Sequence, residues 1–318
     1  MNFEQFVIIS NPASTNAQRM QNRIAELKSL YPNAEITMIQ TSPQGRAADK
    51  KILSRCADKL GQGSLLCVAA GDGTINTVVQ ELLTDTSLSK EASHTPLLPL
   101  WGGNANDLAS MLNGPSYSAS LKRILESGRI VTVSPLECHL TASDRAETIR
   151  YATCYASFGA SAFVAGVLAK FVRRQSLLHK LPGGRFLQEL SLVARALMQA
   201  PTFAIRDDDK IRAIYERAFL KGSRFAKTGG VPQRLTDDTF HAVTVGHKRL
   251  LTLMYRISEM TRRSRKSKFV RKHTSFTVLE TAWAQFDGET ERITAGTKID
   301  VRLSKKPFYA LSTRLADK

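Results

Sequence analysis

The sequence predicts an N-terminal α/β domain followed by a mostly antiparallel β domain. In roughly the first 135 residues, apolar strand-like runs alternate with helical patterns, which is typical of a parallel sheet with helices on both faces. Beyond about Val131 strands dominate. The 318 residues are too many for one typical domain and enough for two. We therefore divide the chain into residues 1–132 and 133–306; whether residues 307–318 return to the first domain stays open.

The elements follow from the spacing of the apolar residues. A short apolar run bounded by turn residues indicates a strand, and apolar residues three or four positions apart indicate a helix. The N-terminal part has predicted strands at 6–10, 34–40, 65–69 and 95–100, with helices at 15–30, 46–60, up to Leu83, and from about 108. The C-terminal part has predicted strands at 130–140, 151–158, 210–220, 240–246, 274–280, 283–286 and 298–303, with helices at 162–174 and 185–199.

Composition favours a cytoplasmic protein. No apolar run approaches the roughly 18 residues of a membrane span. The N-terminus carries an acid, Glu4, and no basic segment, so we expect no signal peptide. Four scattered cysteines without C-x-x-C spacing favour reduced core thiols, and the six histidines form no H-E-x-x-H pattern that would suggest zinc.

Positive charge concentrates in one stretch, residues 248–272, which we call the basic segment. The net charge of the chain is +17, and this segment holds ten Lys or Arg and one acid, Glu259. Nucleic acid, anionic lipid and a polyanionic substrate are candidate partners, as is a solvated face with no partner. Because no base-reading motif accompanies it, we expect an anionic phospholipid surface and no nucleic acid. Its densest part is Arg262, Arg263, Arg265, Lys266, Lys268, Arg271 and Lys272.

The stretch 65–83 is a candidate phosphate site. A strand-like run leads directly into Gly71-Asp72-Gly73-Thr74 and then into a helix. Glycines let a ligand approach the backbone, and the helix N-terminus favours negative charge. Asp72 would repel bare phosphate, so it indicates a metal–nucleotide complex or a ribose contact. Asn76 stands where a dinucleotide fingerprint needs glycine, and an ordinary tight turn is the competing reading.

Three further turns carry polar groups. Gly102 to Asp107 and the Asn11-Pro12 turn each follow a predicted strand of the parallel sheet, where ligands gather at the carboxyl ends. A well-capped helix is the alternative for the former. Late in the chain, Asp287-Gly288-Glu289 follows a strand. It is either a plain hairpin turn or a rigid mount for a general base.

Together these motifs resemble the diacylglycerol kinase catalytic-domain family, soluble lipid kinases that include sphingosine and ceramide kinases. The family pattern of G-G-D-G-T, G-T-x-N-D and D-G-E turns corresponds to residues 70–74, 103–107 and 287–289. The segment 41–47 and Phe158-Gly159-Ala160 also look like family positions. The resemblance runs from about Val7 to Leu303.

The resemblance implies a Rossmann-like α/β domain that binds ATP, a C-terminal β-sandwich domain for the acceptor lipid, and an active site in the cleft between them. It implies that Glu289 is the general base, that Asp72 and Asp107 serve Mg²⁺-ATP, and that Asp287 supports Glu289 or the metal. The implied nucleotide-binding residues are Asn11, Pro12, Thr41, Arg46, Gly71, Asp72, Gly73, Thr74, Gly103, Asn104, Asn106 and Asp107.

The chain departs from the family pattern at several places. Ala70 replaces a glycine, Asn104 a threonine and Arg46 a common histidine, and Trp101-Gly102 looks like an insertion. Where the family reads D-D-G-L-L-D at an accessory metal site, this chain has Asp237-Asp238-Thr239-Phe240-His241. The loss of the glycine and the last acid puts the accessory Mg²⁺ site at Asp238 in doubt.

The predicted function is an ATP- and Mg²⁺-dependent lipid kinase, with diacylglycerol as the expected acceptor and phosphatidic acid as product. Ceramide, a sphingoid base, or a soluble acceptor of the NAD or sugar type stay open, as does a non-catalytic membrane adaptor. We expect peripheral membrane association. Residues 163–181 are either a membrane contact or a core helix of the β domain. A homodimer stays open.

Overall fold

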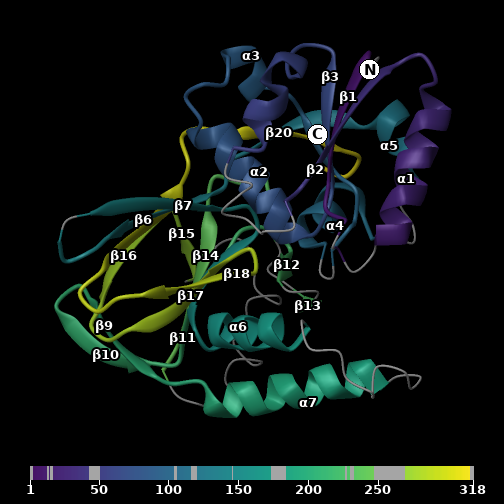
Figure 1. Cartoon of the computed structure of the whole chain (residues 1–318). Coiled ribbons are helices and arrows are strands. Elements are labelled where there is room, and N and C mark those ends of the chain that lie inside the picture. The colour runs from purple at the N-terminus through teal and green to yellow at the C-terminus, as the bar shows by residue number, and fades with distance from the viewer. Residues whose placement is uncertain are drawn as a thin grey trace.

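The computed structural model describes residues 3–12, 14, 17–42, 51–103, 106–115, 120–144, 146–172, 184–225, 228–229, 233–246 and 269–315. These residues form three six-stranded sheets and one two-stranded sheet. One sheet, flanked by helices, lies in the upper part of Figure 1, and the other two six-stranded sheets face each other below it.

The first sheet has the strand order β2-β1-β3-β4-β20-β5. Strands β1 (Gln5–Ser10), β2 (Glu35–Gln40), β3 (Ser64–Ala69), β4 (Leu97–Pro99) and β20 (Phe308–Ser312) run parallel, and β5 (Arg129–Val133) is antiparallel to β20. Every residue of β3 is buried, as expected for a central strand covered on both faces. The segment that returns to this sheet late in the chain therefore separates β4 from β5.

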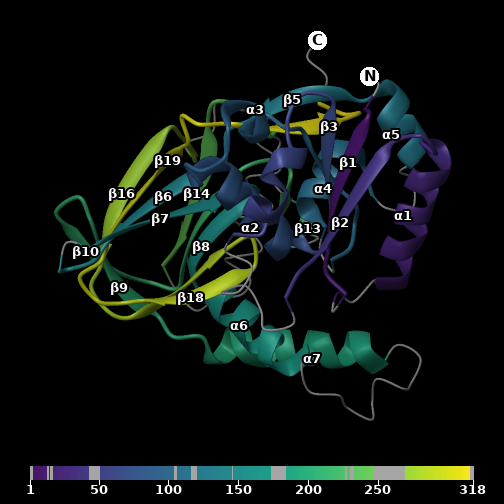
Figure 2. The ribbon, with the colours of Figure 1, turned by 45° about the horizontal axis from the view of Figure 1, so that its top comes forward.

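Helices cover both faces of this sheet (Figure 2). Helices α1 (Ala17–Leu30) and α5 (Leu121–Ser127) pack their apolar residues against the strand side chains on one face of the sheet. Helix α2 (Asp72–Thr84) and the 3₁₀ helix η1 (Leu53–Lys59) pack against the other set. The elements α3 (Lys90–Ser93) and α4 (Asp107–Asn113) complete the unit. Parallel strands with helices on both faces are what the alternating pattern predicts.

The remaining two six-stranded sheets enclose a shared core that is rich in phenylalanine. Phe158 lies at its centre, in edge-to-face contact with Phe219, Phe276 and Phe286. The second sheet has the order β10-β9-β16-β19-β6-β7, and the third β15-β14-β11-β8-β17-β18. Their strands are β6 (Leu136–Thr141), β7 (Glu147–Ala152), β8 (Tyr155–Gly159), β9 (Phe203–Asp207), β10 (Lys210–Ile214), β11 (Glu216–Leu220), β14 (Phe240–Val245), β15 (Val270–Arg271), β16 (His273–Val278), β17 (Ala282–Phe286), β18 (Glu289–Ile293) and β19 (Lys298–Leu303).

Two helices and a small hairpin complete this part. Helix α6 (Ala160–Val172) packs on β8 and β17, and α7 (Gly184–Gln199) packs on α6, away from the sheets (Figure 1). The hairpin pairs β12 (Arg224–Phe225) with β13 (Thr228–Gly229).

Three predicted strands are wrong because each contains a break at which the chain passes from one sheet to another. The predicted strand 130–140 is β5 and β6, in different sheets, with Pro135, which lacks an amide donor, between them. The predicted strand 210–220 is β10 and β11. The predicted strand 151–158 is interrupted at Thr153 and Cys154, whose amides bind a side chain instead of a neighbouring strand.

Candidate active site

Three turns meet at the carboxyl ends of β1, β3 and β4. The amide of Asn11 donates to the carbonyl of Ala69 at 3.2 Å, and the amide of Gly102 donates to the carbonyl of Ala70 at 3.1 Å. The Ser14 hydroxyl donates to the carbonyl of Gly102. The Asn11-Pro12 turn, the first glycine turn and the second glycine turn are therefore neighbours, as expected for loops at one edge of a parallel sheet.

Two glycines in these turns are required by close backbone approach. A Cβ on Gly103 would lie 2.4 Å from the Cα of Gly71, and a Cβ on Gly102 would lie 2.7 Å from the amide nitrogen of Ala70. Both distances are shorter than side-chain contacts allow. Trp101-Gly102, which looks like an insertion in the sequence, is thus where the second turn packs onto the first.

The Asp72 carboxylate joins the two glycine turns. One oxygen accepts the amide of Asn106 at 2.7 Å, and the other accepts the amide of Asp107 at 3.0 Å. Asn106 has a left-handed φ of 54°, and its side chain bonds both the amide and the carbonyl of Gly103. Asp72 is also the first residue of α2, so the N-termini of α2 and α4 are held together by one side chain.

Negative charge accumulates at this junction. Burial raises the pKa of Asp72 to about 7, and the charges of Asp107 and Asp287 add to the rise. Asp107 is almost fully buried. Among the described residues no group of three His, Cys, Asp or Glu side chains has the spacing of a complete metal site. A Mg²⁺ ion bound with a nucleotide needs only one or two carboxylates besides phosphate oxygens, and Asp72 with Asp107 fits that requirement.

Asp287 lies in the two-residue turn between β17 and β18. Its φ is 49° and that of Gly288 is 87°, as in the type I′ turns that favour Asp-Gly. The carboxylate accepts the Asn76 amide at 2.9 Å, the Thr153 hydroxyl at 2.8 Å and the Thr153 backbone amide. It also accepts the amides of Cys154 and Tyr155, each at 2.9 Å. The turn is thus tied to α2 and to the end of β7.

Glu289 is placed by that turn. It pairs with Phe286 across the hairpin, is partly buried, and accepts a hydrogen bond from the Thr77 hydroxyl of α2 at 3.4 Å. It lies on the wall of a cleft of about 510 Å³ between α2 and the β17–β18 hairpin. The cleft is lined by Asn76, Thr77, Gln80, Glu81, Thr84, Arg150, Phe286, Glu289, Thr290 and Glu291. Only one of these ten side chains, Phe286, is hydrophobic.

Sequence reasoning missed the side chains that connect the two halves of the site. Asn76 donates to the carbonyl of Tyr151 at 2.8 Å as well as to Asp287, and Thr77 reaches Glu289. Thr153 supplies two of the donors to Asp287. The available signal was a pair of polar residues, Asn76 and Thr77, inside the apolar pattern of a helix.

The other predicted site residues fall into two groups. Thr41 is buried beside Ser10, whose carbonyl accepts its amide at 2.9 Å, and Pro12 is exposed. Arg46 and Asn104 lie outside the described residues, as does the basic segment except for residues 269–272. Within those four, Lys272 forms an ion pair with Asp238 at 2.9 Å.

The structure describes only part of the segment that we predicted to contact a membrane. In the segment 163–181, residues 173–181 lie outside the described residues, and Phe163 stacks edge-to-face on Trp283. Across the part of the chain that the structure describes, no helix is long and apolar enough to cross a membrane.

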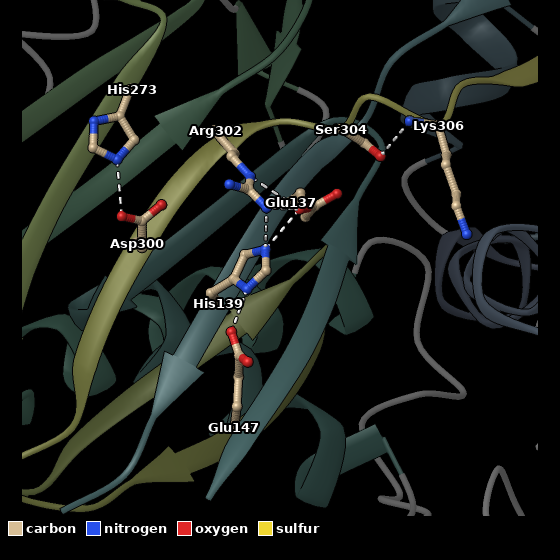
Figure 3. Close-up of polar contacts among 8 residues, drawn as sticks. All are labelled: Glu137, His139, Glu147, His273, Asp300, Arg302, Ser304 and Lys306. Carbon is tan, nitrogen blue, oxygen red and sulfur yellow. Dashed lines mark hydrogen bonds and ion pairs between the residues drawn. The ribbon is translucent and has the colours of Figure 1, made fainter. Parts of the chain in front are cut away.

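A second polar cluster lies on the outer face of the second sheet (Figure 3). His139 lies between Glu137 at 2.6 Å and Glu147 at 2.5 Å, and Arg302 contacts Glu137 at 2.8 Å. Burial by itself lowers the pKa of His139, but the hydrogen bonds with the two carboxylates raise it. Opposite charges on adjacent strands stabilise a sheet, so we assign this cluster to strand pairing.

Comparison with known proteins concerns the family and the fold of the chain. Residues 5–138 match the family model described as the diacylglycerol kinase catalytic domain. Among curated proteins no sequence matches. A diacylglycerol kinase from Bacillus anthracis is 14% identical with a TM-score of 0.63, covering 98% of both chains. A second structure from that organism, provisionally described as a diacylglycerol kinase, is 16% identical with a TM-score of 0.67 and the same coverage.

The fold is also similar to that of yeast NADH kinase in complex with NADH, at 13% identity and a TM-score of 0.51, covering 98% of this chain and 84% of that one. At such identities the likeness to solved structures concerns the fold. The match over residues 5–138 is to a kinase catalytic domain, and it confirms the resemblance of this chain to the diacylglycerol kinase catalytic-domain family.

Proposed function

We propose that the protein is an ATP- and Mg²⁺-dependent kinase that phosphorylates a lipid hydroxyl, with diacylglycerol as the first candidate acceptor. One observation carries the proposal: Glu289 is held on a rigid turn, against α2, on the wall of a cleft. A general base needs such a fixed position within reach of the acceptor proton.

In the proposed phosphoryl transfer, each group of site residues has a separate role. The glycine turns and the N-terminus of α2 would present backbone amides to the nucleotide phosphates. Asp72 and Asp107 would hold the Mg²⁺ that accompanies ATP, and this ion supplies neutralisation of phosphate charge when bound. Glu289 accepts the proton of the acceptor hydroxyl. Asp287 is a positioning residue because five protein hydrogen bonds saturate its carboxylate. Each Asp72 oxygen accepts a single amide from the described residues and keeps a lone pair for a metal ion.

The membrane assignment rests on charge. A lipid acceptor must be reached at a bilayer surface, and the basic segment would hold the protein on anionic phospholipid. Peripheral attachment of the protein to the cytoplasmic face of a membrane is part of that proposal.

A polar acceptor is the second candidate, and the lining of the cleft favours it. Nine of its ten lining side chains are polar or charged, and Arg150 and Glu291 form an ion pair across two strands at 2.9 Å. A sugar or nucleoside hydroxyl would find hydrogen-bonding partners there, whereas an acyl chain would need apolar walls. The fold likeness to an NADH kinase is compatible with such an acceptor.

The experiment uses γ-labelled ATP and Mg²⁺ with two acceptor pools, a mixed-lipid extract in detergent micelles and a mixture of nucleosides, NAD and sugars. Labelled products are identified by mass spectrometry. The Glu289→Gln variant tests the base, and Glu126→Gln, on the exposed surface of α5, is the matched control.

A labelled phospholipid that is lost in Glu289→Gln and kept in Glu126→Gln would support the lipid kinase. A labelled soluble product with the same dependence would support the second candidate. Tight ATP binding without any labelled product would contradict both and favour a non-catalytic adaptor.

A further inference from the structure

Lys221 is a fully buried lysine that the kinase chemistry does not use. It follows β11 directly and none of its surface is exposed. Burying an ammonium group is unfavourable unless hydrogen-bond acceptors replace the water that it loses. The acceptors around the Lys221 ammonium group therefore indicate its structural role.

The ammonium group of Lys221 contacts a different segment, the loop of residues 233–239 that precedes β14. It donates to the carbonyl oxygen of Asp237 and, at 3.5 Å, to that of Thr239. The Gln233 side chain also donates to the Thr239 carbonyl, and its own oxygen contacts His241 Nδ1 at 2.7 Å. One cation and one amide thus organise the carbonyl oxygens of this loop.

The two carboxylates of the loop are directed to other partners. An oxygen of Asp237 accepts the amide of Arg234 at 3.0 Å. Asp238 forms an exposed ion pair with Lys272 at 2.9 Å. These are the residues at which the family resemblance implies an accessory Mg²⁺. In each of the two carboxylates, an oxygen that could ligate that ion therefore already has a protein partner.

We propose that the ammonium group of Lys221 is the resident cation of the loop 233–239, and that this loop binds no divalent metal ion. Mg²⁺ needs a near-octahedral set of oxygen ligands, and the carbonyls that could contribute already face a positive charge. A second cation at the same oxygens would meet electrostatic repulsion in a buried environment.

Charge and position support this assignment. Burial lowers the pKa of Lys221 to about 8, against the attraction of Asp237 and Asp238, so the group is largely protonated at neutral pH. The backbone amide of Lys221 donates to the carbonyl of Cys154 at 2.7 Å, and the amide of Cys154 donates to Asp287. Lys221 thereby links the loop to the turn that places Glu289 without a second metal ion.

The decisive experiment counts divalent ions in the nucleotide-free protein. Mn²⁺ is titrated into the wild type and into the double variant Asp237→Asn/Asp238→Asn, and bound ions are measured by electron paramagnetic resonance. We expect the same number of bound ions in both proteins. One Mn²⁺ ion that binds to the wild type and is lost in the double variant would overturn the proposal.

A second experiment tests whether the ammonium group stabilises the loop. Lys221→Met keeps the length of the side chain and removes the charge, and Lys210→Met, in the exposed part of β10, is the control. We expect Lys221→Met to lower Tm by about 5 °C or more in both EDTA and Mg²⁺, and the control to leave Tm unchanged. An unchanged Tm in Lys221→Met would refute the role.

If Lys221→Met does not fold, the Mn²⁺ titration of the wild type and of the double variant still tests whether the loop binds a metal ion. Neither measurement uses the kinase reaction, so the outcome is independent of the proposed activity.

Discussion

The Asp287-Gly288-Glu289 turn holds two carboxylates, two positions apart, whose replacement should affect different properties of the protein. Asp287 is 3% exposed and accepts hydrogen bonds from α2, from the residues between β7 and β8, and from the start of β8. Glu289 is partly exposed and accepts a hydrogen bond from the Thr77 hydroxyl at 3.4 Å. We expect Asp287→Ala to reduce stability, and Glu289→Gln to reduce turnover.

The loss of stability expected for Asp287→Ala follows from the hydrogen-bond donors that lose their acceptor. Three backbone amides, the Asn76 amide and the Thr153 hydroxyl lose their acceptor. Each orphaned buried donor costs about 1–3 kcal/mol, but the hydroxyl can rotate, and loss of the buried carboxylate recovers part of its desolvation cost. About 4 kcal/mol is a reasonable sum, which is a large fraction of a typical stability of about 5–15 kcal/mol. For Glu289→Gln less than about 1 kcal/mol is expected.

Thermal unfolding followed by circular dichroism measures the first effect, and phosphate transfer at saturating ATP measures the second. Asp287→Ala should unfold roughly 10 °C below the wild type. Glu289→Gln should unfold within about 2 °C of the wild type, bind ATP normally, and turn over on the order of 10²-fold more slowly.

Two results would refute this reasoning. If Asp287→Ala unfolds at the wild-type temperature, its hydrogen bonds do not organise the turn. If Glu289→Gln keeps near wild-type turnover, Glu289 is not the base.

Three further predictions concern the glycine turns and two titrating groups. Gly103→Ala, whose Cβ would lie 2.4 Å from Gly71, should destabilise the protein by about 1–3 kcal/mol in chemical unfolding and weaken ATP binding, whereas Gly246→Ala, with open space around it, should do neither. The folded-state pKa of Asp72 is raised to about 7 from 3.8, so its contribution to stability is fully present below pH 3.8 and is lost as pH rises through 7; Asp72→Asn should remove that loss in metal-free unfolding measurements and weaken binding of Mg²⁺-ATP. The pKa of His139 is raised above 6.5, so its contribution is present below pH 6.5 and is lost as pH rises through the folded-state pKa; His139→Gln should flatten the stability curve there, and an unaltered curve would contradict the assignment.

The sequence predicted the parallel sheet and the places of its turns because both follow from local patterns. Buried strands such as 65–69 read as continuous apolar runs, and glycines mark where the chain reverses at their ends. Since the carboxyl ends of parallel strands share one edge, the proximity of Asn11, Gly71 and Gly103 follows from the order of the predicted strands and turns.

The partners of the polar side chains could not be predicted, because they depend on contacts between distant segments. Asn76 and Asp287 are 211 positions apart and share one hydrogen bond. Lys221 follows an apolar strand and reads as an ordinary surface lysine, although it is fully buried. The sheet breaks near Pro135 and Thr153 were missed for the same reason, since a continuous apolar run does not reveal a change of hydrogen-bonding partner.

Strand β20 has a consequence for synthesis of the protein. Residues 308–312 lie between β4 and β5, so the first sheet lacks an interior strand until that part of the chain has left the ribosome. A fragment that ends near residue 138 would expose the edges of β4 and β5, and exposed edges promote aggregation. The first sheet should therefore form only after the β-rich part of the chain has been made, and ribosome-bound nascent chains ending before residue 308 should remain sensitive to protease.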